Sequence, residues 1–79
     1  MIASEARVIE VLSEVFRGKG LTPPALAPQT IVDDGSLGLE SLDFAEMVIR
    51  LEEMTGSDPF ATGEEFTIHT ISDIAVLYE

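Results

Sequence analysis

The side chains able to do nucleophilic or metal chemistry are few in this sequence. It has no cysteine and a single histidine, His69, so a zinc knuckle is excluded. A Ser-His-Asp arrangement could be drawn from Ser41, His69 and an acid, but 79 residues are too few to enclose a substrate pocket as well. A calcium loop starting at Asp33 also fails, because its twelfth position is Phe44, where a bidentate glutamate is required. The inventory favours a protein that is not itself an enzyme.

Ser41 nevertheless stands at a chemically useful place, the first turn of a helix predicted from Glu40 to about Thr55. Serine is a frequent N-cap, but a capping box from Ser41 would need Glu or Gln where Phe44 stands. The spacing from Glu40 to Asp43 fits a box instead, which leaves the Ser41 hydroxyl facing outward. The free backbone donors and the positive dipole end at this turn favour a phosphate esterified to that hydroxyl.

This helix carries two apolar stripes. The first, a natural core face, consists of Phe44, Met47, Val48 and Leu51. The second consists of Leu42, Ala45 and Ile49, and beside it run the acids Glu40, Asp43, Glu46 and Glu53. A helix that is apolar on two sides can be central and buried, and periodicity alone leaves that interpretation open. The flanking acids favour a recognition face at the surface instead.

The helix with Ser41 at its start follows another helix and a long connection. Apolar residues at helical spacing predict the first helix from about Ile2 to Arg17, ended by Gly18 and Gly20. They are Ile2, Ala6, Ile9, Leu12 and Phe16, with Val8, Val11 and Val15 widening the stripe. No periodic pattern follows between Leu21 and Gly38, where three prolines predict a loop. Apolar residues spaced along this loop predict that it is ordered against the core.

Two shorter helices are predicted after the central one. Asp58-Pro59 is typical of a cap followed by proline at the first helical position, which predicts a third helix to about Glu65. Thr70 and Asp73 fit a capping box at the start of the last helix. The fold class expected is therefore all-α: one domain over residues 1–79, built as a four-helix bundle with a short third helix and a long loop between helices 1 and 2.

Charge restricts the partners most strongly. Fifteen acidic and four basic residues give a formal net charge of −11 at pH 7. Such a field repels nucleic acid and anionic membranes and steers the chain toward basic protein surfaces. The sequence contains no run long enough to span a membrane and no signal-peptide pattern at its start. We therefore expect a soluble, cytoplasmic monomer that binds no nucleic acid and does not insert into membranes.

The run from Leu37 to Glu53, LGLESLDFAEMVIRLEE, resembles the attachment region of acyl carrier proteins. In that family a Gly-x-Asp-Ser-Leu motif opens the second helix, and its serine bears 4′-phosphopantetheine. The corresponding residues here are Gly38-Leu39-Glu40-Ser41-Leu42, with Glu40 in place of the usual aspartate. The order of helices and loop extends the resemblance over nearly the whole chain.

The resemblance implies a non-catalytic carrier. A separate phosphopantetheinyl transferase would attach 4′-phosphopantetheine to Ser41, and the thiol of this arm would carry acyl groups as thioesters in fatty acid, polyketide or related specialised biosynthesis. Acyl-loading and acyl-processing enzymes with basic surfaces would dock on Glu40, Leu42, Asp43, Ala45, Glu46, Ile49 and Glu53. A short acyl chain would be sheltered by interior residues such as Phe16, Val48, Leu51 and Ile74. No metal site is implied.

Two alternatives stay open. Within the same family, the chain could be a peptidyl or aminoacyl carrier, although the net charge and the acidic second helix lean toward acyl cargo. In a different class, it could be an unmodified acidic helical module that binds a basic partner. The presence of a prosthetic group on Ser41 would distinguish a carrier protein of either kind from an unmodified interaction module.

Overall fold

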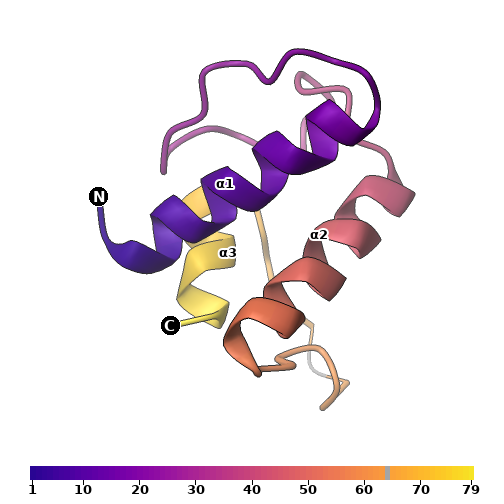
Figure 1. Cartoon of the computed structure of the whole chain (residues 1–79). Helices are drawn as coiled ribbons and strands as arrows, with labels where there is room; N and C mark the ends of the chain where they lie inside the picture. The colour runs from indigo at the N-terminus through magenta and orange to yellow at the C-terminus, as the bar shows by residue number, and fades with distance from the viewer. Residues whose placement is uncertain (64) are drawn as a thin grey trace.

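The computed structural model describes residues 1–63 and 65–79. In this part of the chain there are three helices, α1 (Ala3–Gly18), α2 (Ser41–Thr55) and α3 (Ile71–Leu77), and no strand. Helix α1 contacts both other helices, lying across α3 and beside α2 (Figure 1). The long connection between α1 and α2 passes over the C-terminal end of α1 (Figure 1). None of the three helices is long and apolar enough to cross a membrane.

The core lies where the apolar face of α1 meets α2 and α3. Its largest fully buried side chains are Leu12, Leu51, Ile71, Ile74, Val8, Val11 and Val15. Burial of aliphatic side chains of this size contributes about 1.5–3 kcal/mol each, and no disulfide supplements them. The predicted apolar stripe of α1 is confirmed for Val8, Val11, Leu12, Val15 and Phe16, and Ile9 is half-buried. Ile2, the N-cap residue, and Ala6 are exposed instead.

The predicted loop between α1 and α2 is ordered by backbone bonds to the segment before α3. These hydrogen bonds run from Val32 N to His69 O (2.8 Å), from Ile71 N to Thr30 O (3.1 Å) and from Ser72 N to Pro28 O (2.8 Å). Ile31 and Thr70 form an isolated antiparallel bridge at the same place. The Val32 side chain is buried in the core. The prediction that apolar residues hold this loop to the core is confirmed in part: Leu26 and Leu37 pack against the core, whereas Leu21 and Ile31, also expected to do so, are exposed.

The capping box predicted at the start of α3 is confirmed as well. Asp73 N donates to Thr70 Oγ1 at 3.2 Å, and Thr70 N donates to Asp73 Oδ2 at 3.0 Å. The same carboxylate oxygen accepts a hydrogen bond from His69 N at 2.9 Å. These backbone donors, His69 first, lower the pKa of Asp73 below its usual value.

The third helix predicted from Asp58 to about Glu65 does not form. Ala61 N donates to Asp58 O at 3.2 Å and Gly63 N donates to Phe60 O at 3.3 Å, so the chain makes turns instead. Gly63 adopts a φ of +76°, which a helix cannot continue through. A stretch this short gains too few hydrogen bonds to offset helix nucleation. Glu64 lies outside the described residues, and the four-helix prediction gives way to three helices plus turns.

The two stripes of α2 predict different costs of truncation. Leu51→Ala empties a site that is 0% exposed and should lower the free energy of unfolding by about 2–5 kcal/mol. Ile49→Ala, on the same helix but 55% exposed, should cost less than about 1 kcal/mol. Urea denaturation of both variants checks this. Equal losses would mean that the second stripe is core as well.

Candidate functional site

Ser41 is the first residue of α2, and it is exposed. The chain enters the helix through a turn in which Gly38 N donates to Gly35 O at 3.1 Å and Gly38 adopts a φ of +70°. Glu40 is the extended N-cap residue. Because Ser41 and Leu42 lie in the first turn, no earlier helical carbonyl is available to their backbone N–H groups. The hydroxyl therefore lies at the surface, beside backbone donors and the positive end of the helix dipole.

Asp43 is not part of the exposed acidic face on which the sequence placed it. Only 7% of the residue is exposed, and its Oδ2 accepts hydrogen bonds from Glu40 N and from Lys19 Nζ, both at 2.8 Å. The Glu40 backbone donor first, and then the Lys19 ammonium, lower the pKa of Asp43. The capping geometry explains the correction: a carboxylate at the third helical position turns back toward the N-cap and cannot also face a partner.

Lys19 is a residue of this site that the sequence did not reveal. It is the C-cap residue of α1, and its backbone N–H bonds to carbonyls of the last turn of that helix. Its ammonium bonds to Asp43, which raises the pKa of Lys19 above its usual value. The end of α1 and the beginning of α2 are therefore tied together one turn from Ser41.

The second apolar stripe of α2 reaches the surface. Leu42 is 79% exposed and Ile49 is 55% exposed, and Ala45 between them is exposed too. Glu40 and Glu53 are exposed at the two ends of the stripe. Periodicity had left a buried, central helix as an alternative interpretation, and these exposures exclude it.

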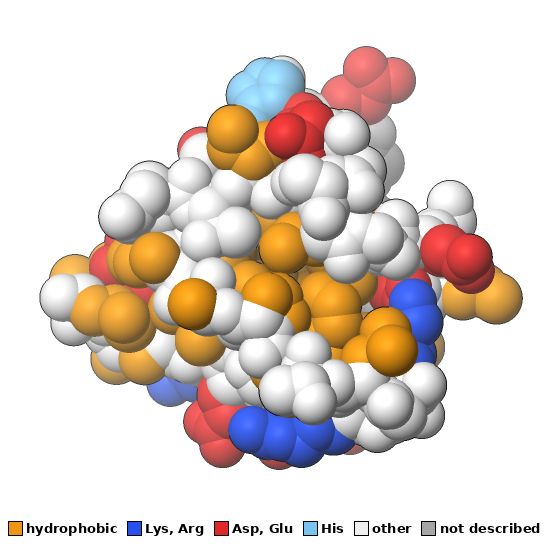
Figure 2. Space-filling model, turned by 90° about the horizontal axis from the view of Figure 1, so that it is seen from above, with side chains coloured by type: hydrophobic (Ala, Val, Ile, Leu, Met, Phe, Trp, Pro, Cys, Tyr) orange, Lys and Arg blue, Asp and Glu red, His pale blue; other side chains and the backbone are white. Residues whose placement is uncertain are grey.

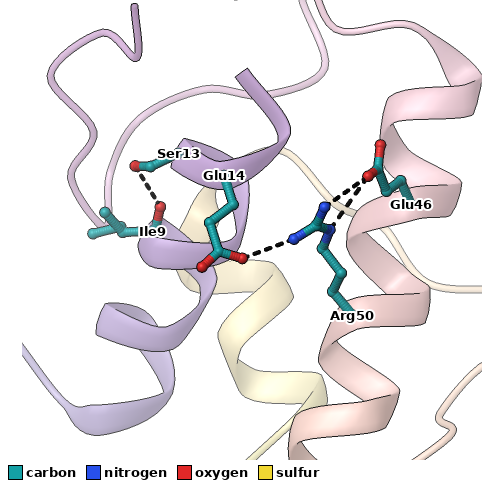
Figure 3. Close-up of polar contacts among 5 residues, drawn as sticks. All are labelled: Ile9, Ser13, Glu14, Glu46 and Arg50. Carbon is teal, nitrogen blue, oxygen red and sulfur yellow. Dashed lines mark hydrogen bonds and ion pairs between the residues drawn. The ribbon is translucent and has the colours of Figure 1, made fainter. Parts of the chain in front are cut away.

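Glu46 lies at the surface, but its carboxylate is paired with Arg50. Arg50 Nη2 bonds to Glu46 Oε1 at 2.9 Å, and Arg50 Nη1 bonds to Glu14 Oε2 of α1 at 2.8 Å (Figure 3). The guanidinium of Arg50 lies between the two carboxylates, so it joins the middle of α2 to α1 and partly neutralises Glu46. The least compensated acids beside the apolar stripe are thus Glu40 and Glu53.

An apolar pocket of about 510 Å³ opens beside α2. It is lined by Val32, Asp33, Phe44, Ala45, Met47, Val48, Ile49, Phe60, Ile68 and Ile74. Of the four residues expected to shelter an acyl chain, Val48 and Ile74 line the pocket, whereas Phe16 and Leu51 pack inside the core. Phe44 and Ala45 follow Ser41 by one helical turn, a rise of about 5.4 Å. The pocket and the exposed hydroxyl are therefore neighbours on α2.

The walls of the pocket away from α2 come from the loop before α2, from the turns after it, and from α3 and the segment before α3. Phe60 packs edge-to-face on Phe66, with ring centroids 5.5 Å apart and an interplanar angle of 89°. Asp33, the charged lining residue, forms a side-chain hydrogen bond with His69 Nδ1. Figure 2 shows hydrophobic side chains gathered in the middle of one face of the molecule, with His69 in pale blue and acidic side chains at its margin.

Acidic crowding is strongest at the C-terminal end of α2. A side-chain hydrogen bond with Asp58, together with burial and its negative charge, raises the pKa of Glu52. Burial first, and then the charges of Glu52 and Asp58, raise the pKa of the Tyr78 hydroxyl to about 12. The adjacent Asp33 and Asp34 each have a hydrogen-bonding partner. Asp33 pairs with His69, and Asp34 accepts hydrogen bonds from Ser36 that lower its pKa.

The described residues contain no group of three or more His, Cys, Asp or Glu side chains that could hold a metal ion. Comparison with protein-family models, with curated proteins and with solved structures finds no match for this chain.

The carboxylates predict a stability maximum at mildly acidic pH. The raised pKa of Glu52 means that folding takes up a proton, so stability grows as the pH falls through that pKa toward 4.5, the ordinary value. Asp43 and Asp73 have lowered pKa values, so their contribution is present above 3.8, the ordinary value, and is lost as the pH falls toward the folded pKa. Melting curves across pH check this shape.

Glu52→Gln isolates the first part of this effect. The neutral side chain removes the repulsion with Asp58 and should raise the melting temperature at neutral pH. Glu53→Gln changes the net charge equally at an exposed position on the same helix and serves as the control. Equal shifts in the two variants would assign the effect to bulk charge.

Proposed function

We propose that the chain is an acyl carrier protein in which Ser41 carries 4′-phosphopantetheine. The observation that carries the proposal is the place of Ser41: it is exposed at the first position of α2, directly after the Gly38 turn, within Gly38-Leu39-Glu40-Ser41-Leu42. An apolar pocket begins one helical turn further along the same helix. The attachment residue, the docking surface and one wall of the cargo pocket would then all lie on α2.

The chain's own contribution to attachment is a hydroxyl at a helix N-terminus. Ser41 Oγ would form the new P–O bond to the phosphopantetheine phosphorus of coenzyme A. The P–O bond that links this phosphorus to the second phosphate of coenzyme A would break, and the adenosine bisphosphate portion would leave. The serine proton would pass to the transferase or to water. The phosphodiester anion formed would lie beside the first-turn N–H groups and the positive dipole end, which favours it. Once attached, the arm supplies the thiol that this cysteine-free chain lacks.

The exposed stripe supports docking to partner enzymes. Leu42, Ala45 and Ile49 offer a narrow apolar strip, and Glu40 and Glu53 border it with negative charge. A partner with a basic rim and an apolar centre complements this surface. The contact would be small, which suits a carrier that must visit several enzymes and leave them quickly.

The pocket bears on the class of cargo. Its lining is aliphatic and aromatic except at Asp33, which is already paired with His69. Burying a charged aminoacyl ammonium among such residues is costly, whereas an aliphatic chain gains free energy there. The lining therefore favours acyl over aminoacyl cargo. Fatty acid and polyketide pathways both use such chains, and the lining does not separate them.

Ser41→Ala provides the direct test of attachment. The wild-type chain, co-expressed with a broad-specificity phosphopantetheinyl transferase, should gain the mass of one phosphopantetheine group, and Ser41→Ala should not. The variant should keep its fold, because a first-turn hydroxyl contributes about 1 kcal/mol at most. Ser36→Ala, in the exposed loop before α2, is the matched control and should be fully modified. A wild-type chain that gains no mass would instead favour the unmodified interaction module.

Leu42→Ser tests the docking face. Loss of this exposed side chain should lower the transferase kcat/KM about fivefold to tenfold while leaving the melting temperature nearly unchanged. Met54→Ser removes another exposed apolar side chain, 50% exposed, at the other end of α2 and should have little effect on modification. Equal losses for both variants would show that recognition does not depend on the stripe next to Ser41.

A further inference from the structure

One carboxylate oxygen joins the end of α1 to the residue before Ser41. Asp43 Oδ2 accepts hydrogen bonds from Lys19 Nζ and from Glu40 N, each at 2.8 Å. The Asp43 side chain is largely closed to solvent, at 10% exposed, and the side chain of Lys19, 30% exposed, covers it from the surface. Lys19 is in turn fixed by its own backbone, which bonds to Val15 O and Phe16 O at the end of α1.

This junction determines how firmly the first turn of α2 is held. Glu40 is a poor N-cap residue, and its side chain makes no capping hydrogen bond. The carboxylate of Asp43 therefore supplies the side-chain cap that the structure describes at this helix start. The chain before it turns at the exposed Gly35 and Gly38, both with positive φ, while Leu37 and Leu39 pack against the core. Without a fixed Asp43, the first turn of α2 would lose this side-chain cap.

The positive charge of Lys19 also favours a role for this residue near Ser41. A phosphodiester on Ser41 would place a new anion within one turn of Asp43 and Glu40. The ammonium of Lys19, bonded to Asp43, offsets one of these two carboxylates. Arg17 lies two residues away on α1 but is exposed, and no ion pair joins it to α2 among the residues that the structure describes.

We propose that Lys19 is a positioning residue for Ser41: by holding Asp43 against Glu40 N–H, it keeps the first turn of α2 in the geometry that a phosphopantetheinyl transferase requires. The inference rests on the proposed function. It also makes a statement about the unmodified chain, namely that Lys19 protects the first turn of α2 from local opening. The two parts can therefore be tested separately.

The kinetic test uses Lys19→Gln, Lys19→Arg and Arg17→Gln with coenzyme A and a broad-specificity transferase. Lys19→Gln should lower the kcat of the transferase about fivefold or more, with little change in the KM for this chain. Misplacing the reacting Ser41 hydroxyl affects the chemical step rather than binding. Lys19→Arg keeps a cation and its donors and should restore most of the rate. Arg17→Gln removes the same charge from the same end of α1 and should have little effect. A change confined to KM, or equal effects of Lys19→Gln and Arg17→Gln, would overturn the proposal.

The structural test uses amide hydrogen exchange on the unmodified chain. Lys19→Gln should speed exchange in the first turn of α2, at Asp43 and Phe44, more than at Leu51 in the core. Exchange that rises uniformly, or not at all in the first turn, would contradict the positioning role. If the transferase does not modify even the wild-type chain, the proposed function fails, and exchange alone still decides whether Lys19 holds this turn.

Discussion

The apolar face of α1 is the constraint on which the rest of the fold depends. Val8, Val11, Leu12 and Val15 are fully buried, and both other helices pack against the helix that carries them. A chain of 79 residues without a disulfide has little else with which to stabilise a compact state. Because α2 uses one side to cover this face, its opposite side is left at the surface. The exposure of the apolar stripe beside Ser41 therefore follows from how the core is built.

The scarce positive charges are placed where they join helices. The chain has four basic residues against fifteen acidic ones. Lys19 ties the end of α1 to Asp43 at the start of α2, and Arg50 ties the middle of α2 to Glu14 of α1. Half of the available cations thus join one helix pair, and they do so by pairing with the buried Asp43 and with Glu14, which is partly exposed. The uncompensated acids are left on the outer side, where they give the surface its negative field.

Sequence periodicity and capping motifs predicted the helices and caps that depend on interactions between residues close in the chain. The ranges expected for α1 and α2 agree with the structure to within one or two residues, and Thr70 caps α3 as expected. The third helix failed because a cap-and-proline signal cannot show whether enough residues follow to offset nucleation. The pairing of Lys19 with Asp43 spans 24 residues, and no spacing rule reveals such a contact. The burial of Asp43 could have been predicted, because the capping-box spacing from Glu40 to Asp43 already assigned its carboxylate to the start of the helix.

The pocket was the least predictable feature, because its walls come from segments far apart in the chain. Helix α2 supplies one wall in regular helical register. The others come from the loop around Val32, from the turns that carry Phe60, and from Ile68 before α3 and Ile74 within α3. The loop and the turns are held by isolated backbone bonds and one aromatic contact. Segments held in this way open at a lower free-energy cost than a helix packed on the core. A cargo on the proposed arm could thus enter or leave past the loop walls, while α2 and the turn that holds Ser41 stay in place.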